Sequence, residues 1–134
     1  MEQRFPISSD SLNDVFTFLN RTLTAESADP AASYAIELAV EELFTNIVKY
    51  SRGARTDVAI DVERHGDRLI VTLIEEDVEP FDATHWAEPD TSKPLDERNV
   101  GGLGIHLVKQ MVDELHYRYE GRRGITTIMK RLEQ

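Results

Sequence analysis

The feature that most constrains the fold is the apolar periodicity of residues 36–51, IELAVEELFTNIVKYS. Ile36, Val40, Leu43 and Ile47 recur at helical spacing, so the stretch predicts an amphipathic helix with one buried stripe. No other stretch of the chain has so strong a helical pattern. The remaining segments therefore have to supply the surface against which this stripe is buried.

Two polar side chains stand at the edge of that stripe. Glu42 and Asn46 are four residues apart, so they lie roughly 40° apart around the helix axis, on neighbouring turns of one face. A carboxylate and an amide held between core and cleft can act as general base and metal ligand. They can equally be the solvated flank of an amphipathic helix, and the helix taken alone favours that second interpretation.

Composition limits the classes of protein to consider. A chain of 134 residues predicts one domain, residues 1–134. The formal net charge of −10 argues against a general nucleic-acid or anionic-membrane surface. The absence of cysteine excludes disulfides and thiolate metal sites. No signal-peptide core or membrane-length apolar run occurs, so a cytoplasmic location is expected by default.

The segments before the opening helix predict a strand and a second helix. Residues 4–7 form a short apolar run in which Pro6 favours an edge position. Residues 8–10 offer an N-cap for the helix that follows, and Pro30 suits the first turn of the next one. The stripe expected to face the core from that earlier helix is Leu12, Val15, Phe16, Leu19 and Leu23.

Four further strands are predicted as two hairpins. Residues 56–65 and 67–77 alternate around the turn His65-Gly66-Asp67, and the second run is apolar on both faces, which predicts a central strand. Residues 116–121 and 125–132 alternate around a second turn, Gly121 to Gly124. The order β-α-α-β-β-loop-α-β-β favours an α+β two-layer sandwich with a mixed, mostly antiparallel sheet and helices on one face.

A long aperiodic stretch, residues 77–100, separates the two hairpins. Loops of this length in a compact domain are usually functional. The loop ends at Gly101-Gly102-Leu103-Gly104, a glycine-rich turn that opens into a helix predicted over residues 105–115. Such a turn presents backbone N–H groups and the positive end of the helix dipole to an anion.

These features follow one another in a set order: a helix with E-x-x-x-N, an acidic strand end at Glu75, Glu76 and Asp77, a long loop, and G-x-G at a helix start. In this order the chain resembles the Bergerat-fold (GHKL) ATPase superfamily, which is shared by gyrase, sensor histidine kinases and MutL. It is most similar to the stand-alone anti-sigma-factor serine kinases of the RsbW and SpoIIAB type. The resemblance covers nearly the whole chain and implies a Bergerat-type ATP-binding sandwich.

The resemblance assigns roles to the residues of the opening helix. ELFTNIVKYS, residues 42–51, matches the N box of the superfamily. Glu42 falls at the general-base position, and Asn46 falls at the position that coordinates Mg²⁺ and contacts the nucleotide. Lys49 and Tyr50 continue the box as nucleotide-binding positions, with the lysine near the phosphates.

Residues 101–115 match the second glycine box, in which Gly101, Gly102, Leu103 and Gly104 would approach the phosphates. The last strand matches the one whose threonine lies near the nucleotide, and either Thr126 or Thr127 would be that residue.

The first glycine box departs from the D-D-G-x-P-F-D pattern of this branch. Aligning on Pro80-Phe81-Asp82 puts Glu76 at the adenine-recognising aspartate and Val78 at the first glycine. Asp77 would take the place of Glu76 if the strand end shifted by one residue.

The resemblance implies a serine/threonine protein kinase that uses ATP and Mg²⁺ and acts as an anti-sigma factor. It would sequester a sigma factor and phosphorylate an anti-anti-sigma protein of the STAS type, with residues 80–100 as a lid; a homodimer is compatible with the resemblance. A detached histidine-kinase catalytic domain ranks lower, because no helical hairpin with a phosphoacceptor histidine precedes the fold. A non-enzymatic binding module, with an altered first glycine box, is the third interpretation.

Overall fold

The computed structural model describes residues 1–53, 57–84 and 100–133, with residues 100–103 described as helix backbone. The elements along the chain are β1 (Glu2–Pro6), a short 3-10 turn η1 (Ser9–Ser11), α1 (Leu12–Ala25), α2 (Pro30–Tyr50), β2 (Asp57–His65), β3 (Arg68–Glu76), α3 (Val100–Met111), β4 (Glu114–Glu120) and β5 (Arg123–Arg131). No helix of the described part is both long and apolar enough to cross a membrane.

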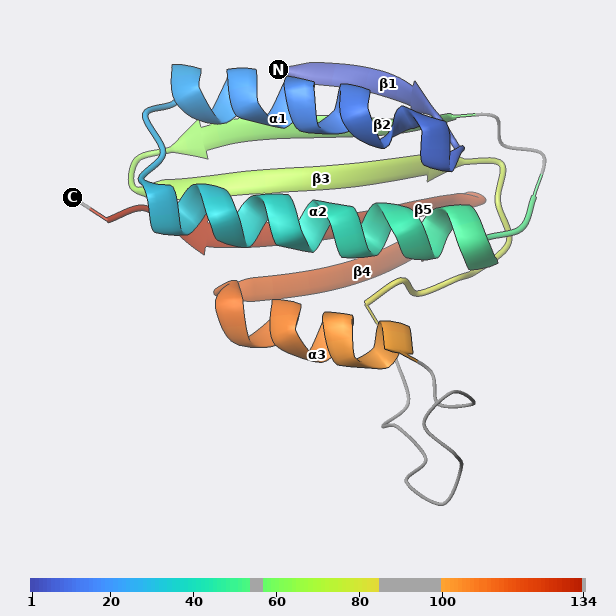
Figure 1. Ribbon diagram of the computed structural model, residues 1–134. Helices are drawn as coiled ribbons and strands as arrows, with labels where there is room; N and C mark the ends of the chain where they lie inside the picture. Colours follow the sequence, from blue (N-terminus) through green and yellow to red (C-terminus); the bar gives the residue numbers. More distant parts are fainter. Residues whose placement is uncertain (54–56, 85–99, 134) are drawn as a thin grey trace.

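The strands form one sheet in the order β1-β2-β3-β5-β4. Each of the four described pairings is antiparallel, so the sheet predicted as mixed and mostly antiparallel contains only antiparallel neighbours here. The two predicted hairpins, the central β3 and the edge position of β1 are confirmed. Figure 1 shows all three helices covering one face of this sheet, which confirms the two-layer α+β arrangement.

The long helix α2 begins where its capping residues dictate. The Asp29 side chain accepts a hydrogen bond from the Ala32 N–H at 3.1 Å, and Pro30 occupies the first turn as predicted. A second hydrogen bond, from the Glu133 N–H at 2.9 Å, ties the C-terminal segment to the same carboxylate. These contacts fix the start of the helix that carries Glu42 and Asn46.

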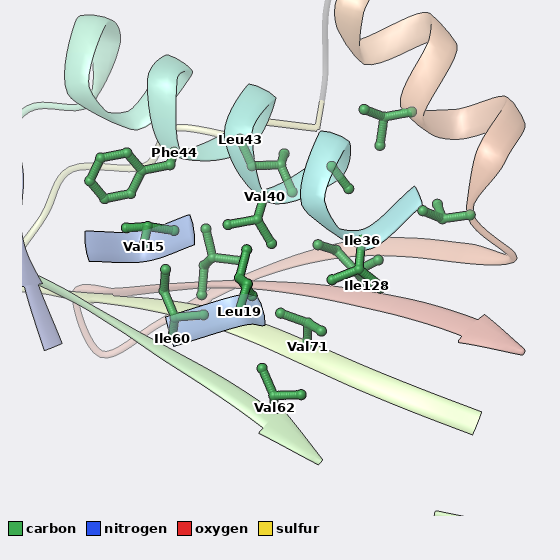
Figure 2. Packing of buried hydrophobic residues seen from close by; sticks show 14 of the residues in the cluster. Val15, Leu19, Ile36, Val40, Leu43, Phe44, Ile60, Val62, Val71 and Ile128 are labelled. Atoms are coloured by element: carbon green, nitrogen blue, oxygen red, sulfur yellow. The ribbon is translucent and has the colours of Figure 1, made fainter. Parts of the chain in front are cut away.

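The core lies between the helices and the inner face of the sheet. Figure 2 shows side chains of α1 and α2 meeting those of β2, β3 and β5; the labelled members are Val15, Leu19, Ile36, Val40, Leu43, Phe44, Ile60, Val62, Val71 and Ile128. The predicted α1 stripe needs one correction. Phe18 is buried against Phe5 with ring centroids 5.6 Å apart, whereas Phe16 is only partly buried.

The third helix differs from its predicted bounds. The glycines expected as a turn lie inside the helix, which starts at Val100 and ends at Met111 rather than running from 105 to 115. The early end has a physical cause, because the Asp113 N–H donates to the Met129 carbonyl at 2.9 Å and the pairing of β4 with β5 begins at Glu114. Leu115, predicted on the helix, therefore belongs to β4.

Candidate functional site

The Glu42 carboxylate lies where α2 packs against α3. Glu42 is partly buried, and a Cβ placed on Gly104 would overlap its carboxylate group, so the carboxylate rests directly on the α3 backbone. Burial raises the pKa of Glu42; the charge of Glu41 raises it further, while the charge of Lys49 lowers it. A carboxylate in this setting is a stronger base than a fully solvated one.

Asn46 follows one helical turn after Glu42 and is only 2% exposed. Its Nδ2 group is buried and has no hydrogen-bond partner in the described part of the chain. A buried donor without a partner costs free energy, and such an amide calls for an explanation such as a bound ligand. The amide can donate Nδ2–H to an anionic oxygen and offer its carbonyl oxygen to a cation.

The two residues that continue the N box point to different neighbours. Lys49 is exposed, and its charge is close enough to lower the pKa of Glu42. Tyr50 packs its ring on Phe81, with centroids 6.2 Å apart and planes at 49°. Lys49 therefore interacts with Glu42 through its charge, whereas Tyr50 packs the end of α2 against the segment that follows β3.

The last buried side chain on the inner face of β3 is a carboxylate, that of Glu75. Along this strand Leu69, Val71, Leu73 and Glu75 are buried, and Glu75 is 5% exposed. The buried hydroxyl of Ser51, the residue after α2, donates to Glu75 Oε2 at 2.7 Å. From the sequence, Glu75 is identified only as part of the acidic strand end and is given no role in the site, although the apolar alternation of β3, carried two residues further, places it on the helix side.

The register of β5 separates the two candidate threonines. Thr126 pairs with Leu73 and is buried, so it shares the inner face with Glu75. Thr127 pairs with Thr72 and faces the other side of the sheet. Only Thr126 is on the side of the sheet that carries α2 and α3.

Glu76 and Asp77 are both exposed and paired with arginines, and the alternation of β3 puts Glu76 on the face opposite the helices. The Glu76 side chain is 55% exposed on the opposite face and forms ion pairs with Arg123 at 3.7 Å and Arg4 at 4.0 Å. Asp77 is also exposed and accepts a hydrogen bond from Arg122 Nε at 2.9 Å. Both acids are thus held by arginines, and Glu76 lies outside the helix layer.

The turn after β3 is made one residue earlier than the Pro-Phe-Asp alignment implies. Asp77 has the left-handed backbone, with φ of +55°, a conformation that aspartate tolerates better than most residues. Val78, at the aligned glycine position, is instead 1% exposed and bridges to Gly53, whose added Cβ would lie 2.5 Å from the Asp77 carbonyl oxygen. The acid that lies two residues before the left-handed turn is therefore Glu75, and the left-handed residue itself is Asp77.

The segment after β3 is held to the sheet by several hydrogen bonds. The Tyr119 hydroxyl donates to the Val78 carbonyl at 2.7 Å, and the Val78 N–H donates to the Arg122 carbonyl at 3.1 Å. The Phe81 N–H donates to the Tyr117 hydroxyl at 3.1 Å. This end of the site is thereby fixed against β4 and the turn between β4 and β5.

The glycines of the second box open α3. Gly101, Gly102 and Leu103 lie in its first turn, where helix N–H groups have no partner within the helix. The greater part of the predicted lid, residues 85–99, is outside the described residues. Within the described ranges, no cluster of three or more His, Asp or Glu side chains could hold a metal ion.

Comparison with known proteins defines the class. The family model of the histidine kinase-like ATPase domain matches residues 5–131, so the chain belongs to this family. The fold is of the GHKL, or Bergerat, ATP-binding type. A search of curated protein sequences found no match.

Two solved structures share the fold. The RsbU and RsbW domains of Rv1364c from Mycobacterium tuberculosis superpose with a TM-score of 0.67 at 15% identity, covering 100% of this chain and 33% of that one. The Acinetobacter baumannii histidine kinase AdeS gives a TM-score of 0.51 at 17% identity, covering 100% of this chain and 68% of that one. This chain therefore spans about a third of the length of the first of these proteins.

Proposed function

We propose that the protein is an ATP-dependent serine/threonine protein kinase that acts as an anti-sigma factor. The observation that carries the proposal is the unpartnered amide of Asn46, buried one helical turn from the partly buried Glu42 at the junction of α2 and α3. A fold without a ligand at this junction would gain stability by replacing that amide with an apolar group. The retained N–H donor supports a bound polyanion.

The residues present fit Mg²⁺ and ATP. Asn46 would hold Mg²⁺ through its amide oxygen, since Mg²⁺ takes few protein ligands when phosphate oxygens supply the rest. Lys49 and the N–H groups in the first turn of α3 (Gly101 to Leu103) would bind phosphate oxygens. When bound, Mg²⁺ neutralises the charge on the phosphates.

Glu75, rather than Glu76 or Asp77, is the acid we assign to the base of the nucleotide. It is buried on the helix side of the sheet, on the same inner face as Thr126, whereas Glu76 pairs with arginines on the other side. A carboxylate accepts hydrogen bonds only, so it suits the exocyclic amino group of adenine.

Glu42 would serve as the general base of phosphoryl transfer. It accepts the proton of a serine or threonine hydroxyl on the substrate protein as that oxygen forms its bond to the γ-phosphorus. The bond between this phosphorus and the β–γ bridging oxygen breaks, and ADP leaves. The raised pKa of Glu42, caused by its burial, makes the carboxylate a better proton acceptor.

The substrate and partner classes rest on likeness. The motifs resemble those of anti-sigma-factor kinases, and a structure containing an RsbW domain shares the fold. The proposed substrate is an anti-anti-sigma protein of the STAS type, and the proposed sequestered partner is a sigma factor.

A phosphorylation assay tests the proposal. Purified protein is mixed with Mg-ATP and a purified STAS-domain protein, and the phosphate added to the substrate is measured by mass spectrometry. Glu42→Gln should slow transfer by roughly 10²- to 10⁴-fold. The matched control, Glu37→Gln, changes another partly buried glutamate of α2 and should leave the rate within about threefold of wild type. Equal rates for wild type and Glu42→Gln would contradict the assigned base.

One observation favours a second candidate, a non-enzymatic binding module. Val78 replaces the aligned glycine and fills its position with a buried side chain. A module of this kind would bind its protein partner equally well with and without nucleotide. A pull-down of the sigma factor with and without Mg-ATP, together with the phosphorylation assay, separates the two candidates.

A further inference from the structure

We propose that Gly104 is a positioning residue for Glu42: the missing side chain at 104 creates the space in which the Glu42 carboxylate rests on α3. The inference depends on the proposed function in one respect, that Glu42 acts as the base. The resemblance implies only that Gly104 lets the backbone approach the phosphates. The inference adds that the first turns of α3 form one side of the space that holds Glu42, the proposed base.

Among the glycines whose surroundings the structure describes, Gly104 is the one whose added Cβ would meet Glu42; a Cβ on Gly53 would also clash, but with the backbone of Asp77 and Val78. The three atoms nearest to a Cβ built on Gly104 are the Cδ, Oε1 and Oε2 atoms of Glu42, and all of them would overlap it. A Cβ on Gly124 would meet nothing closer than 3.7 Å, and a Cβ on Gly66 or Gly121 would meet nothing within 4 Å.

A glycine at this place in α3 is disfavoured by helix propensity alone. Gly104 is the fifth residue of the helix, and alanine is more stable than glycine in helical positions. Because the space is filled by a carboxylate and not by backbone, any added side chain must move Glu42. A base displaced by about 1 Å can lose roughly 10²-fold in rate.

The two roles of Gly104 predict different kinetics. If the glycine only lets the backbone approach phosphate, Gly104→Ala weakens nucleotide binding. If it seats Glu42, Gly104→Ala lowers kcat by roughly 10- to 100-fold and leaves the KM for Mg-ATP within about threefold. Phosphoryl transfer to the STAS-domain protein under steady-state conditions measures both quantities.

A second substitution tests whether the clash is the cause. Glu42→Asp shortens the side chain by one methylene and should make room for the new Cβ. The double variant Gly104→Ala/Glu42→Asp should therefore have a kcat at least tenfold above the product of the two single effects. A rise in KM that matches the fall in kcat, or single effects that simply multiply, would overturn the inference.

A thermal-unfolding cycle tests the same pair without any activity. In a Glu42→Ala background, Gly104→Ala should raise the Tm by about 3 °C, because alanine favours helix and the clash is gone. In wild type and in Glu42→Gln, which keeps the size of the side chain, the gain should vanish or reverse. An equal gain in Tm in all three backgrounds would refute the role of Gly104 in positioning Glu42. A wild-type protein without kinase turnover would refute only the proposed kinase function.

Discussion

Replacement of Asn46 by leucine should stabilise the protein while abolishing nucleotide binding. Leucine has the same branching as asparagine, and the site is 2% exposed with its Nδ2 group unpartnered. Removing a buried, unsatisfied amide should raise the free energy of unfolding by about 1–3 kcal/mol, and the greater bulk of leucine should offset part of that increase. A net gain of about 1–2 kcal/mol corresponds to a rise in Tm of roughly 3–8 °C.

Thermal unfolding with and without Mg-ATP measures both halves of this prediction. Thr22→Val is the matched control, because Thr22 is equally buried but its hydroxyl donates to the Phe18 carbonyl at 3.0 Å. Losing that hydrogen bond should lower stability by about 0.5–1.5 kcal/mol. An Asn46→Leu variant destabilised like the control would refute the reasoning, since it would mean that the amide is satisfied in the ligand-free protein.

Three further changes have defined outcomes. Ser51→Ala removes the 2.7 Å hydrogen bond to the buried Glu75 carboxylate and should cost about 1.5–3 kcal/mol in urea unfolding; Ser51→Thr, which keeps the hydroxyl, should cost less. Glu42→Gln should match the stability of wild type below pH 4.5, the ordinary pKa of the group, and exceed it at neutral pH. Burial raises the pKa of Glu42 in the folded protein, so wild type loses stability as the pH rises through that raised pKa, whereas glutamine does not ionise. A difference in Tm that does not change with pH would contradict this. Asp29→Ala removes the N-cap of α2 and the tie to Glu133, and chemical denaturation should show a loss of about 1–2 kcal/mol.

The hairpins and the central strand could be predicted from the sequence because alternation and turn residues are local signals. β3 reads as apolar on both faces, and it lies in the middle of the sheet. The bounds of α3 could not be predicted in the same way. Its end is set by the pairing of β4 with β5, a contact distant in sequence.

The placement of the candidate site residues was predictable on the helix and less so on the sheet. Spacing along α2 places Glu42 and Asn46 on one face whatever surrounds them. The acidic strand end depends on register, where a shift of one residue moves a side chain to the opposite face. Alignment on Pro-Phe-Asp selected Glu76, whereas the strand buries Glu75 and turns at Asp77.

The central claim is that the junction of α2 and α3 binds Mg-ATP through Asn46, and isothermal titration calorimetry tests it most directly. Wild type should release or absorb heat on titration with Mg-ATP and saturate at one nucleotide per chain, while Asn46→Leu, folded and at least as stable, should give no binding heat. No heat with wild type at millimolar Mg-ATP, or equal binding by wild type and Asn46→Leu, would contradict the claim.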